Sequence, residues 1–261
     1  MLGNPVAVVL DGSGLDDDAM QLLARWTNLS ETTFVLPSAN PGADYRVRIF
    51  TPAAELPFAG HPTLGTCHAW LEHGGRPARD DVIVQECAAG LIPIRRTEAG
   101  LAFSAPPLVR SGPVEPELQA RIAEMLRIDP GEILDAHWVD NGPGWVGVLL
   151  ADAQAVLDVR PGTVDLDVGV VGPHPAGHEA SFEVRAFFPV DGATREDPVT
   201  GSLNASLADW LLSSGRATAP YTAAQGTAMG RRGRVRISVD DEGVIWVAGA
   251  THTSIAGTLE L

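Results

Sequence analysis

An internal repeat limits the folds open to this chain more than any other feature of its sequence. Residues 47–52 (VRIFTP) match residues 184–189 (VRAFFP), with Val, Arg, Phe and Pro in register. One loop is four residues longer in the second copy, and residues 55–61 (ELPFAGH) then align with 196–202 (EDPVTGS). A β-strand, a turn and the start of a helix therefore recur in the same order, which predicts two similar domains.

The two copies also end alike, because Gly74 and Gly215 fall at the same place after the predicted helices. Glycine is the residue that most often ends a helix in the left-handed conformation. Strand-rich stretches with single helices between them favour an α+β architecture over a series of βαβ crossovers. We expect an N-terminal domain at residues 1–108 and a C-terminal domain at 109–261, whose last strand can pack back on the first domain.

The charged residues exclude several classes of function. The 33 acidic and 18 basic residues give a net charge of −15, which opposes binding to nucleic acid or to an anionic membrane. All 18 basic residues are arginine, so no lysine is present to form a Schiff base or to serve a phosphate-binding P-loop. We expect neither a nucleic-acid nor a membrane partner. The arginines at residues 231–236 are expected to form internal ion pairs or a subunit contact.

The N-terminus and the two cysteines favour a cytoplasmic location. Residues 1–5 contain no basic signal-peptide region, and the longest apolar runs are only as long as a strand. Cys67 and Cys87 match no zinc-binding spacing and are too few for a disulfide framework. We expect both thiols to stay free in a reducing compartment and to be dispensable for activity.

An amphipathic helix is predicted over residues 16–28. Aspartates at its start complement the helix dipole, and Leu22 and Trp26 are among the apolar residues at helical spacing. We expect these two side chains to face the core.

Each repeated turn brings a polar residue, His61 or Ser202, to the beginning of a predicted helix. Pro62 suits the first helical position, and Ser202 suits the N-cap. Helix N-termini carry unsatisfied N–H groups and a partial positive charge, so both turns could bind a carboxylate or stabilise an oxyanion without lysine. The alternative is that both turns are simply tight connections between a strand and a helix.

Five segments resemble the phenazine biosynthesis PhzF-like family. They are 55–65 (ELPFAGHPTLG), 196–202 (EDPVTGS), 3–9 (GNPVAVV), 28–35 (NLSETTFV) and 225–230 (QGTAMG). The first two resemble the signature loops of the family, and the resemblance extends over essentially the whole chain. The family has a strand before the Gly-Asn-Pro that this sequence does not contain. Either the coding start lies further upstream, or the first domain lacks an edge strand.

The resemblance implies the diaminopimelate epimerase-like fold. This fold has two pseudo-symmetric α+β domains, each a curved, mostly antiparallel sheet around a central helix, with the active site in the cleft between them. The resemblance also implies an isomerase, usually a homodimer, that works without cofactor or metal. The implied substrate is a small carboxylate-bearing compound, such as a dihydro-hydroxyanthranilate, and the implied reaction is an intramolecular proton shift or an epimerisation.

Carried over residue by residue, the resemblance places the proton-transferring glutamate at Glu31 and implies catalytic roles for His61 and Asp197. Related amino-acid epimerases exchange protons through two cysteines, but Gly60 and Gly201 occupy those places here, so a two-thiol racemase is disfavoured. A carboxylate suits the task, because one base can remove a proton from one carbon and return it to another on the same face. The substrate-binding residues that the resemblance implies are Ser202, Gly60, Gly201 and Gly230.

Two other functions stay open on the sequence alone. A hydrolase or lyase could use His61 and Ser202, although Ser202 lacks the Gly-x-Ser-x-Gly setting of a nucleophile elbow and is better suited to binding. A catalytically inactive protein could keep the fold and bind small carboxylates. His174 and His178 have the spacing of a metal pair, but their Gly- and Pro-rich segment cannot form a helix, so no metal site is expected there.

Overall fold

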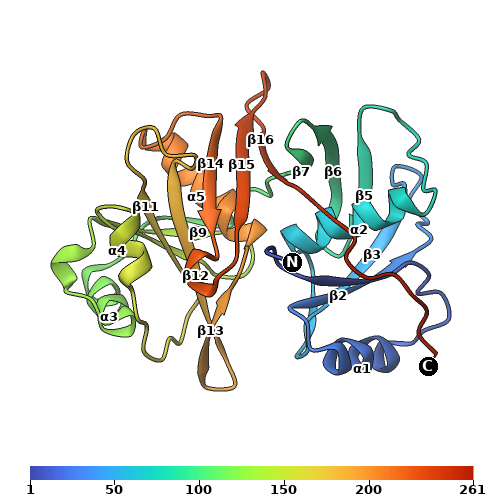
Figure 1. Ribbon diagram of the computed structural model, residues 1–261, viewed down its shortest axis with the longest axis horizontal. Coiled ribbons are helices and arrows are strands. Elements are labelled where there is room, and N and C mark those ends of the chain that lie inside the picture. The colour runs from blue at the N-terminus through green and yellow to red at the C-terminus, as the bar shows by residue number, and fades with distance from the viewer. Residues whose placement is uncertain (261) are drawn as a thin grey trace. The chain divides into compact units, whose positions relative to one another are not determined.

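The computed structural model describes residues 1–260 and contains two compact units (Figure 1). Unit 1 comprises Met1, Pro5–Phe103 and the chain from Ala248 onward, and unit 2 comprises Leu2–Asn4 and Ser104–Val247. Each unit combines a sheet with a few helices, so the predicted α+β class is confirmed. None of the helices among residues 1–260 is long and apolar enough to cross a membrane.

Unit 1 is a mixed sheet with two helices. Its elements are β1 (Val6–Val9), α1 (Asp17–Thr27), β2 (Glu31–Leu36), β3 (Tyr45–Phe50), β4 (Glu55–Leu56), α2 (Gly60–Glu72), β5 (Ile83–Cys87), β6 (Gly90–Thr97) and β7 (Gly100–Ser104). The strands follow the order β1-β2-β3-β5-β6-β7, and β4 pairs with β3. β1 runs parallel to β2 and β3 runs parallel to β5, whereas β2/β3, β5/β6 and β6/β7 are antiparallel.

Unit 2 repeats the strands and helices of unit 1 and has additional elements at its beginning, two of which are strands that extend its sheet. The added elements are β8 (Arg110–Pro113), α3 (Pro116–Leu126), η1 (Pro130–Glu132) and β9 (Asp135–Asp140). The remaining elements are β10 (Val146–Leu149), α4 (Ala153–Asp158), β11 (Val168–Pro173), β12 (Phe182–Val190), β13 (Ala193–Asp197), α5 (Gly201–Ser213), β14 (Tyr221–Gln225), η2 (Thr227–Met229), β15 (Gly233–Val239) and β16 (Ile245–Gly249).

The topology confirms the predicted duplication. The order β1-β2-β3-β5-β6-β7 in unit 1 recurs as β10-β11-β12-β14-β15-β16 in unit 2. The parallel pairs fall at the same places, since β10 runs parallel to β11 and β12 runs parallel to β14. α2 and α5 both contain 13 residues, and Gly74 and Gly215 follow them with positive φ angles of 88° and 71°. Among the described residues β1 is the edge of its sheet, whereas β10 is covered by β9.

The long helix of unit 2 is buried on almost all sides. Nearly every residue of α5 from Gly201 to Leu211 is buried, including the polar residues Ser202, Asn204 and Ser206. The sheet makes room for this helix with glycine: a Cβ at Gly169 would lie 2.3 Å from Leu203 Cδ1. The position of the start of α5 is therefore set by close packing against β11.

The core of unit 1 under α1 differs from the sequence-based prediction. Met20, Leu23 and Ala24 form the buried stripe, which packs with Phe34 and Phe50 of the sheet.

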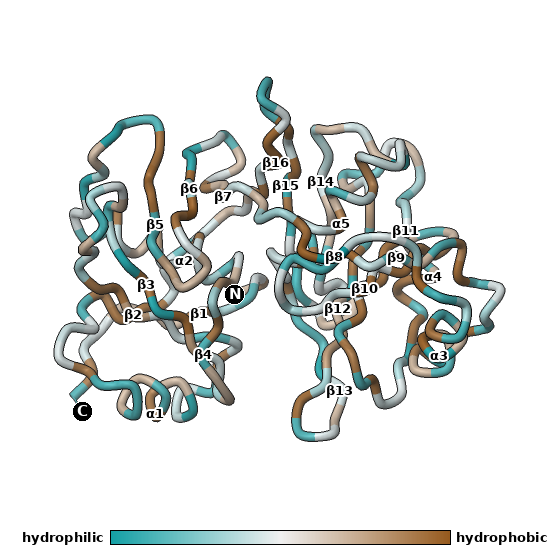
Figure 2. The backbone as a smooth tube through the Cα atoms, turned by 180° about the vertical axis from the view of Figure 1, so that it is seen from behind, coloured by the Kyte–Doolittle hydropathy of each residue, from teal (hydrophilic) through white to brown (hydrophobic). Residues whose placement is uncertain are grey.

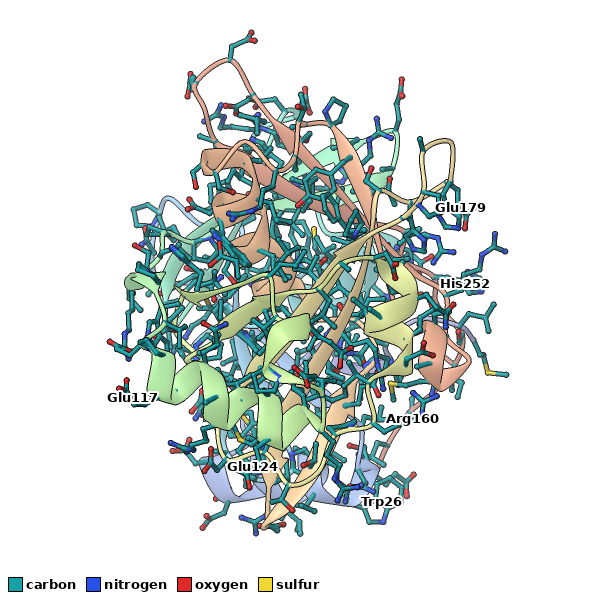
Figure 3. The ribbon with its side chains drawn as sticks, turned by 90° about the vertical axis from the view of Figure 1, so that its left-hand side faces the viewer. Trp26, Glu117, Glu124, Arg160, Glu179 and His252 are labelled. Carbon is teal, nitrogen blue, oxygen red and sulfur yellow. The ribbon has the colours of Figure 1, made fainter. Side chains whose placement is uncertain are left out.

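Leu22 and Trp26, which were expected to face this core, are 64% and 73% exposed instead, and Trp26 projects from the surface in Figure 3. Figure 2 shows hydrophilic and hydrophobic residues alternating along α1. The sequence offers two apolar stripes on this helix, and only packing against the sheet selects one of them.

The structure also corrects the expected helix starts. α2 begins at Gly60 with Ala59 as its N-cap, and α5 begins at Gly201 with Thr200 as its N-cap. His61 and Ser202 are thus the second residues of their helices and not the cap residues. The two remain equivalent to each other, because both helices begin two residues earlier than predicted.

Candidate active site

Unit 1 brings together two of the predicted catalytic residues, Glu31 and His61. Glu31 is the first residue of β2, and His61 is in the first turn of α2. The Oε2 atom of Glu31 lies 3.1 Å from the Nε2 atom of His61, and the two side chains are only 14% and 15% exposed. A carboxylate and an imidazole in contact and sheltered from water form a pair that can hold and transfer a proton.

Unit 2 holds the third predicted catalytic residue, Asp197, by hydrogen bonds to both carboxylate oxygens. The hydroxyl of Thr200 donates to Oδ2 at 2.6 Å, and the side-chain amide of Asn4 donates to Oδ1 at 2.8 Å. Asn4 also donates to the backbone oxygen of Val199 at 3.0 Å. The carboxylate at the end of β13 is therefore fixed just before α5 begins.

The buried side-chain amide of Gln225 holds the loop from Asp197 to Thr200 in place. The Oε1 atom of Gln225 accepts from the backbone N–H of Thr200 at 2.9 Å and from Asn204 Nδ2 at 2.8 Å. Its Nε2 atom donates to the backbone oxygen of Asp197 at 3.0 Å and to Thr200 Oγ1 at 2.9 Å. All the hydrogen-bonding capacity of this side-chain amide is thus used to shape the loop from Asp197 to Thr200.

Sequence reasoning missed Asn4, Thr200 and Asn204 as supports of the site. Asn4 meets Asp197 across 193 positions and Asn204 meets Gln225 across 21, and no local pattern encodes such contacts. For Asn4, Thr200 and Gln225 a signal existed, because all three lie in segments that resemble the family motifs.

Ser202 lies in the same turn and is 8% exposed. Its Oγ atom accepts a hydrogen bond from the indole Nε1 of Trp145 at 3.1 Å, and its backbone oxygen accepts from Asn141 Nδ2 at 2.9 Å. Among residues 1–260, no basic side chain is hydrogen-bonded to this hydroxyl. The environment is that of a binding hydroxyl and not that of an activated nucleophile.

The predicted binding glycines differ in their surroundings. Gly60 and Gly201 are buried first residues of α2 and α5, where backbone N–H groups lack partners within the helix. Gly230 is an exposed residue with a positive φ of 68° after η2. The glycine that abuts the Asp197 loop is Gly226, where a Cβ would lie 2.6 Å from the backbone oxygen of Pro198. A substrate-binding role for Gly230 stays a prediction.

Asp167 occupies in unit 2 the position that Glu31 occupies in unit 1. The residue after Glu31 pairs with Phe50, and the residue after Asp167 pairs with Phe187. These two phenylalanines are matched positions of the internal repeat. Extending the repeat back by one strand would have identified Asp167, although the connection to the next strand is one residue longer in unit 2.

The environment of Asp167 disfavours its charged form. Burial raises the pKa of this carboxyl, and the neighbouring Asp140 carboxylate adds to the effect, so that the pKa reaches about 6. Each half thus carries a carboxyl group at the same place in its sheet.

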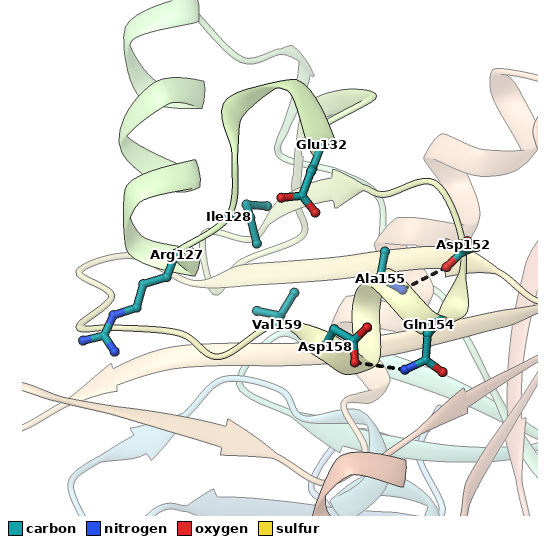
Figure 4. A pocket seen from close by; sticks show the side chains of 8 residues that line it. All are labelled: Arg127, Ile128, Glu132, Asp152, Gln154, Ala155, Asp158 and Val159. Atoms are coloured by element: carbon teal, nitrogen blue, oxygen red, sulfur yellow. Dashed lines mark hydrogen bonds between the residues drawn. The ribbon is translucent and has the colours of Figure 1, made fainter.

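The pockets found within the units do not coincide with these residues. A pocket of about 430 Å³ lies in unit 2 between α3, η1 and α4 (Figure 4). Two of its carboxylates serve local structure, since Asp152 accepts from the N–H of Ala155 and Asp158 accepts from Gln154. A second pocket, of about 450 Å³, lies in unit 1 beside Arg96. None of the predicted site residues lines either pocket.

The other motifs of the sequence have structural roles. The rings of His174 and His178 stack with centroids 3.8 Å apart, and His174 Nε2 lies 3.1 Å from the buried Glu183 carboxylate. Among residues 1–260, no group of three or more His, Cys, Asp or Glu side chains is placed to hold a metal ion. Arg232 and Arg234 pair with Glu179, which confirms the expected internal ion pairs for these two arginines.

Comparisons with known proteins define the class of fold first. The solved structure of a probable proline racemase from Agrobacterium radiobacter K84 matches with a TM-score of 0.52 and 15% identity, over 89% of this chain and 77% of that chain. A Bacillus anthracis protein of the phenazine biosynthesis PhzF family matches with a TM-score of 0.80 and 23% identity, over 95% of this chain and 90% of that chain. The duplicated α+β architecture is therefore the epimerase-like fold that the resemblance implied.

The family follows from the sequence comparison. The family model described as phenazine biosynthesis-like protein (PhzC-PhzF) matches residues 1–258. The chain belongs to this family, and its class of activity is that of an isomerase.

Three curated relatives illustrate the range of the family. The trans-2,3-dihydro-3-hydroxyanthranilate isomerase of Pseudomonas aeruginosa is 36% identical over 79% of this chain and 73% of its own length. An uncharacterized isomerase of Mesorhizobium japonicum is 34% identical over 93% and 87%. The Schizosaccharomyces pombe protein called antisense-enhancing sequence 1 is 34% identical over 98% and 93%.

Proposed function

We propose that this isomerase moves a proton within a small carboxylate-bearing substrate and that Glu31 is its acid–base group. The observation that carries the proposal is the sheltered contact between Glu31 and His61, whose carboxylate and imidazole atoms are 3.1 Å apart. By analogy with the Pseudomonas aeruginosa relative, the substrate class is a dihydro-hydroxyanthranilate.

The chemistry needs a base that keeps the proton it removes. The Glu31 carboxylate takes a proton from one carbon of the substrate and returns it to another carbon, so that no net proton is gained or lost. Low exposure at Glu31 favours return of the same proton over its loss to water. His61, at hydrogen-bonding distance, steadies the charge of the carboxylate or polarises a substituent of the substrate.

Substrate binding is assigned to the two helix starts and to Asp197. In each unit taken by itself, backbone N–H groups at the helix start provide partial positive charge that favours a carboxylate in a chain that has no lysine; they lie at Gly60–His61 in unit 1 and at Gly201–Ser202 in unit 2. Asp197, held by Thr200 and Asn4, provides a fixed acceptor for an amino or hydroxyl group. Independence from cofactors and assembly into a homodimer stay predictions; turnover after exhaustive chelation and analytical ultracentrifugation test them.

The decisive experiment replaces Glu31 by glutamine, which keeps the size of the side chain and removes the base. We expect Glu31→Gln to lower turnover of trans-2,3-dihydro-3-hydroxyanthranilate by roughly two to four orders of magnitude, the usual contribution of a positioned acid–base group. Ligand binding should persist, because the helix starts and Ser202 are unchanged. The matched control is Glu124→Gln, which changes an exposed glutamate on α3.

Two readouts make the outcome unambiguous. Turnover is followed by product formation, and the label that the product acquires in deuterated water measures the share of the transferred proton that exchanges with solvent instead of returning directly. Full turnover in Glu31→Gln would refute the assignment of the base. Binding without turnover or exchange in the wild-type protein would favour an inactive binding protein.

The hydrolase or lyase alternative is not supported. His61 is in contact with Glu31, and the Ser202 hydroxyl accepts from the indole of Trp145. A serine-directed covalent probe is therefore expected to leave Ser202 unmodified.

A further inference from the structure

Ser202 and Trp145 form a buried hydrogen bond whose direction is dictated by chemistry. The indole Nε1 of Trp145 lies 3.1 Å from Ser202 Oγ, and the two residues are 4% and 8% exposed. An indole N–H can only donate, so Ser202 Oγ is the acceptor in this contact. The hydroxyl keeps its own proton for another partner.

That proton has no acceptor within the described chain. Among residues 1–260, Trp145 is the hydrogen-bond partner of Ser202 Oγ. Buried donors are almost always satisfied, and one that is left without a protein acceptor points to water or a ligand. Ser202 is therefore set to donate to an oxygen that the protein itself does not supply.

A buried acceptor without a partner belongs to Asn141, a residue that bonds to the backbone of Ser202. Asn141 donates through Nδ2 to the backbone oxygen of Ser202 at 2.9 Å, and this bond fixes which way its amide faces. The Oδ1 atom of the same amide is buried and has no hydrogen-bond partner among the described residues. An amide oxygen accepts only, so it calls for an N–H or O–H group.

Deepening the function proposed above, on which this inference rests, we propose that Trp145 is a positioning residue for substrate recognition. It holds the Ser202 hydroxyl as a donor toward the carboxylate of the substrate, and Asn141 Oδ1 accepts from an amino or hydroxyl group beside that carboxylate. The site thereby reads a carboxylate together with a neighbouring hydrogen-bond donor. Benzoate-like acids without such a donor can bond to the Ser202 hydroxyl but not to Asn141 Oδ1.

The first test measures the affinity of stable probes by titration calorimetry. Anthranilate carries both groups, anthranilamide lacks the charge, and benzoate lacks the amine. We expect Trp145→Phe to weaken anthranilate binding about three- to tenfold, the range of one hydrogen bond, and to change anthranilamide binding less than about twofold. Asn141→Ala should weaken anthranilate more than benzoate.

The matched control is Trp246→Phe. Trp246 is also buried, at 5% exposure, and its indole donates to Asp240 at 2.8 Å instead of to the site. The same chemical change at this position should leave the affinity for all three probes within about twofold. A loss of affinity as large as that in Trp145→Phe would show that the effect is only structural.

A double-mutant cycle separates positioning from general packing. If Trp145 acts through Ser202, Trp145→Phe has no further effect on anthranilate affinity in a Ser202→Ala background. NMR spectra test the hydrogen bond without any ligand. The Ser202→Ala change should shift the indole N–H resonance of Trp145 and leave that of Trp246 in place. Additive losses of affinity, or an unmoved Trp145 resonance, overturn the proposal.

The test is independent of turnover. Because binding is measured, the same cycle can be run in the Glu31→Gln protein. Suppose that Trp145→Phe has no further effect in the Ser202→Ala background and that Glu31→Gln keeps full turnover. This result defeats the assignment of the base and leaves the recognition site intact. An additive cycle in a protein whose turnover depends on Glu31 defeats the recognition site alone. Failure of the wild-type protein to bind anthranilate at millimolar concentration overturns the recognition site as well.

Discussion

At the scale of single residues, equivalent places in the two halves carry different chemistry. His61 and Ser202 are both the second residues of their helices, yet one contacts a carboxylate and the other accepts from an indole. Glu31 and Asp167 take equivalent places at the start of a strand. The backbone repeats, but the side chains at equivalent places make different contacts.

The cysteines provide a prediction at this scale. Cys67 is fully buried, and burial raises the pKa of its thiol to about 12, so almost no reactive thiolate exists at neutral pH. We expect Cys67→Ala to retain turnover within about twofold while losing about 1–2 kcal/mol of unfolding free energy through the small cavity it creates. Enzyme assays and urea denaturation measure the two effects. Lost turnover in a normally folded Cys67→Ala protein would assign the chemistry to a thiol.

At the scale of elements, each half is fastened by the same ion pair between corresponding strands. Arg48 of β3 bonds to Glu55 of β4 with two contacts of 2.8 and 2.7 Å, and Arg185 of β12 bonds to Glu196 of β13 with contacts of 2.9 and 2.8 Å. The arginine and glutamate are 17% and 37% exposed in unit 1 but 5% and 17% exposed in unit 2. The two ion pairs thus have the same geometry, but the pair in unit 2 is more buried and lies in surroundings of lower dielectric constant.

This difference predicts unequal energies for matched substitutions. Glu196→Ala leaves the buried Arg185 guanidinium without its carboxylate and should cost about 3–5 kcal/mol of unfolding free energy. Glu55→Ala should cost about 1 kcal/mol or less, because Arg48 is more exposed and still pairs with Asp17 at 2.6 Å. Urea denaturation of both variants measures the difference. Equal costs would contradict the argument from burial.

At the scale of the whole molecule, the pKa of Asp167 makes global stability depend on pH. Its pKa is about 6 in the folded chain and 3.8 ordinarily, so between about pH 4 and pH 6 the folded state binds more protons than the unfolded state. The free energy of unfolding therefore falls as the pH rises through this range. Above about pH 6 the contribution of the Asp167 carboxyl to the free energy of unfolding no longer changes with pH.

Replacing Asp167 by asparagine should remove that loss. We expect Asp167→Asn to be more stable than the wild type by about 1–3 kcal/mol at pH 7.5, with the difference closing toward pH 4. Denaturation with urea at both pH values measures it, and Asp241→Asn, at an exposed turn, serves as the control. A stability gain that is the same at both pH values would contradict the link to ionisation.

Much of the molecule was predictable from local pattern. The matched segments around residues 47–61 and 184–202 lie in corresponding strands and helices. The sequence names Glu31, His61, Asp197 and Ser202 as candidate site residues because they lie in segments that resemble the motifs of the family.

The predictions failed where two local patterns compete or where a contact is made over a long distance along the chain. On α1 the sequence contains two apolar stripes, and the sheet buries the one through Leu23 while Trp26 remains exposed. The predicted helix starts were two residues too late, because the cap residues Ala59 and Thr200 make no side-chain cap bond that would mark them.

The sequence by itself determined the duplication and the α+β class, since these depend on periodicity, turn residues and short spacings that act within a few turns of backbone. The candidate site residues followed from the resemblance of their segments to the family. Only the tertiary structure decided which atoms meet. It placed Glu31 against His61, Asn4 against Asp197 and Trp145 against Ser202. The directions and partners of these contacts follow from packing between segments that are distant in the sequence. A local sequence pattern does not encode that packing.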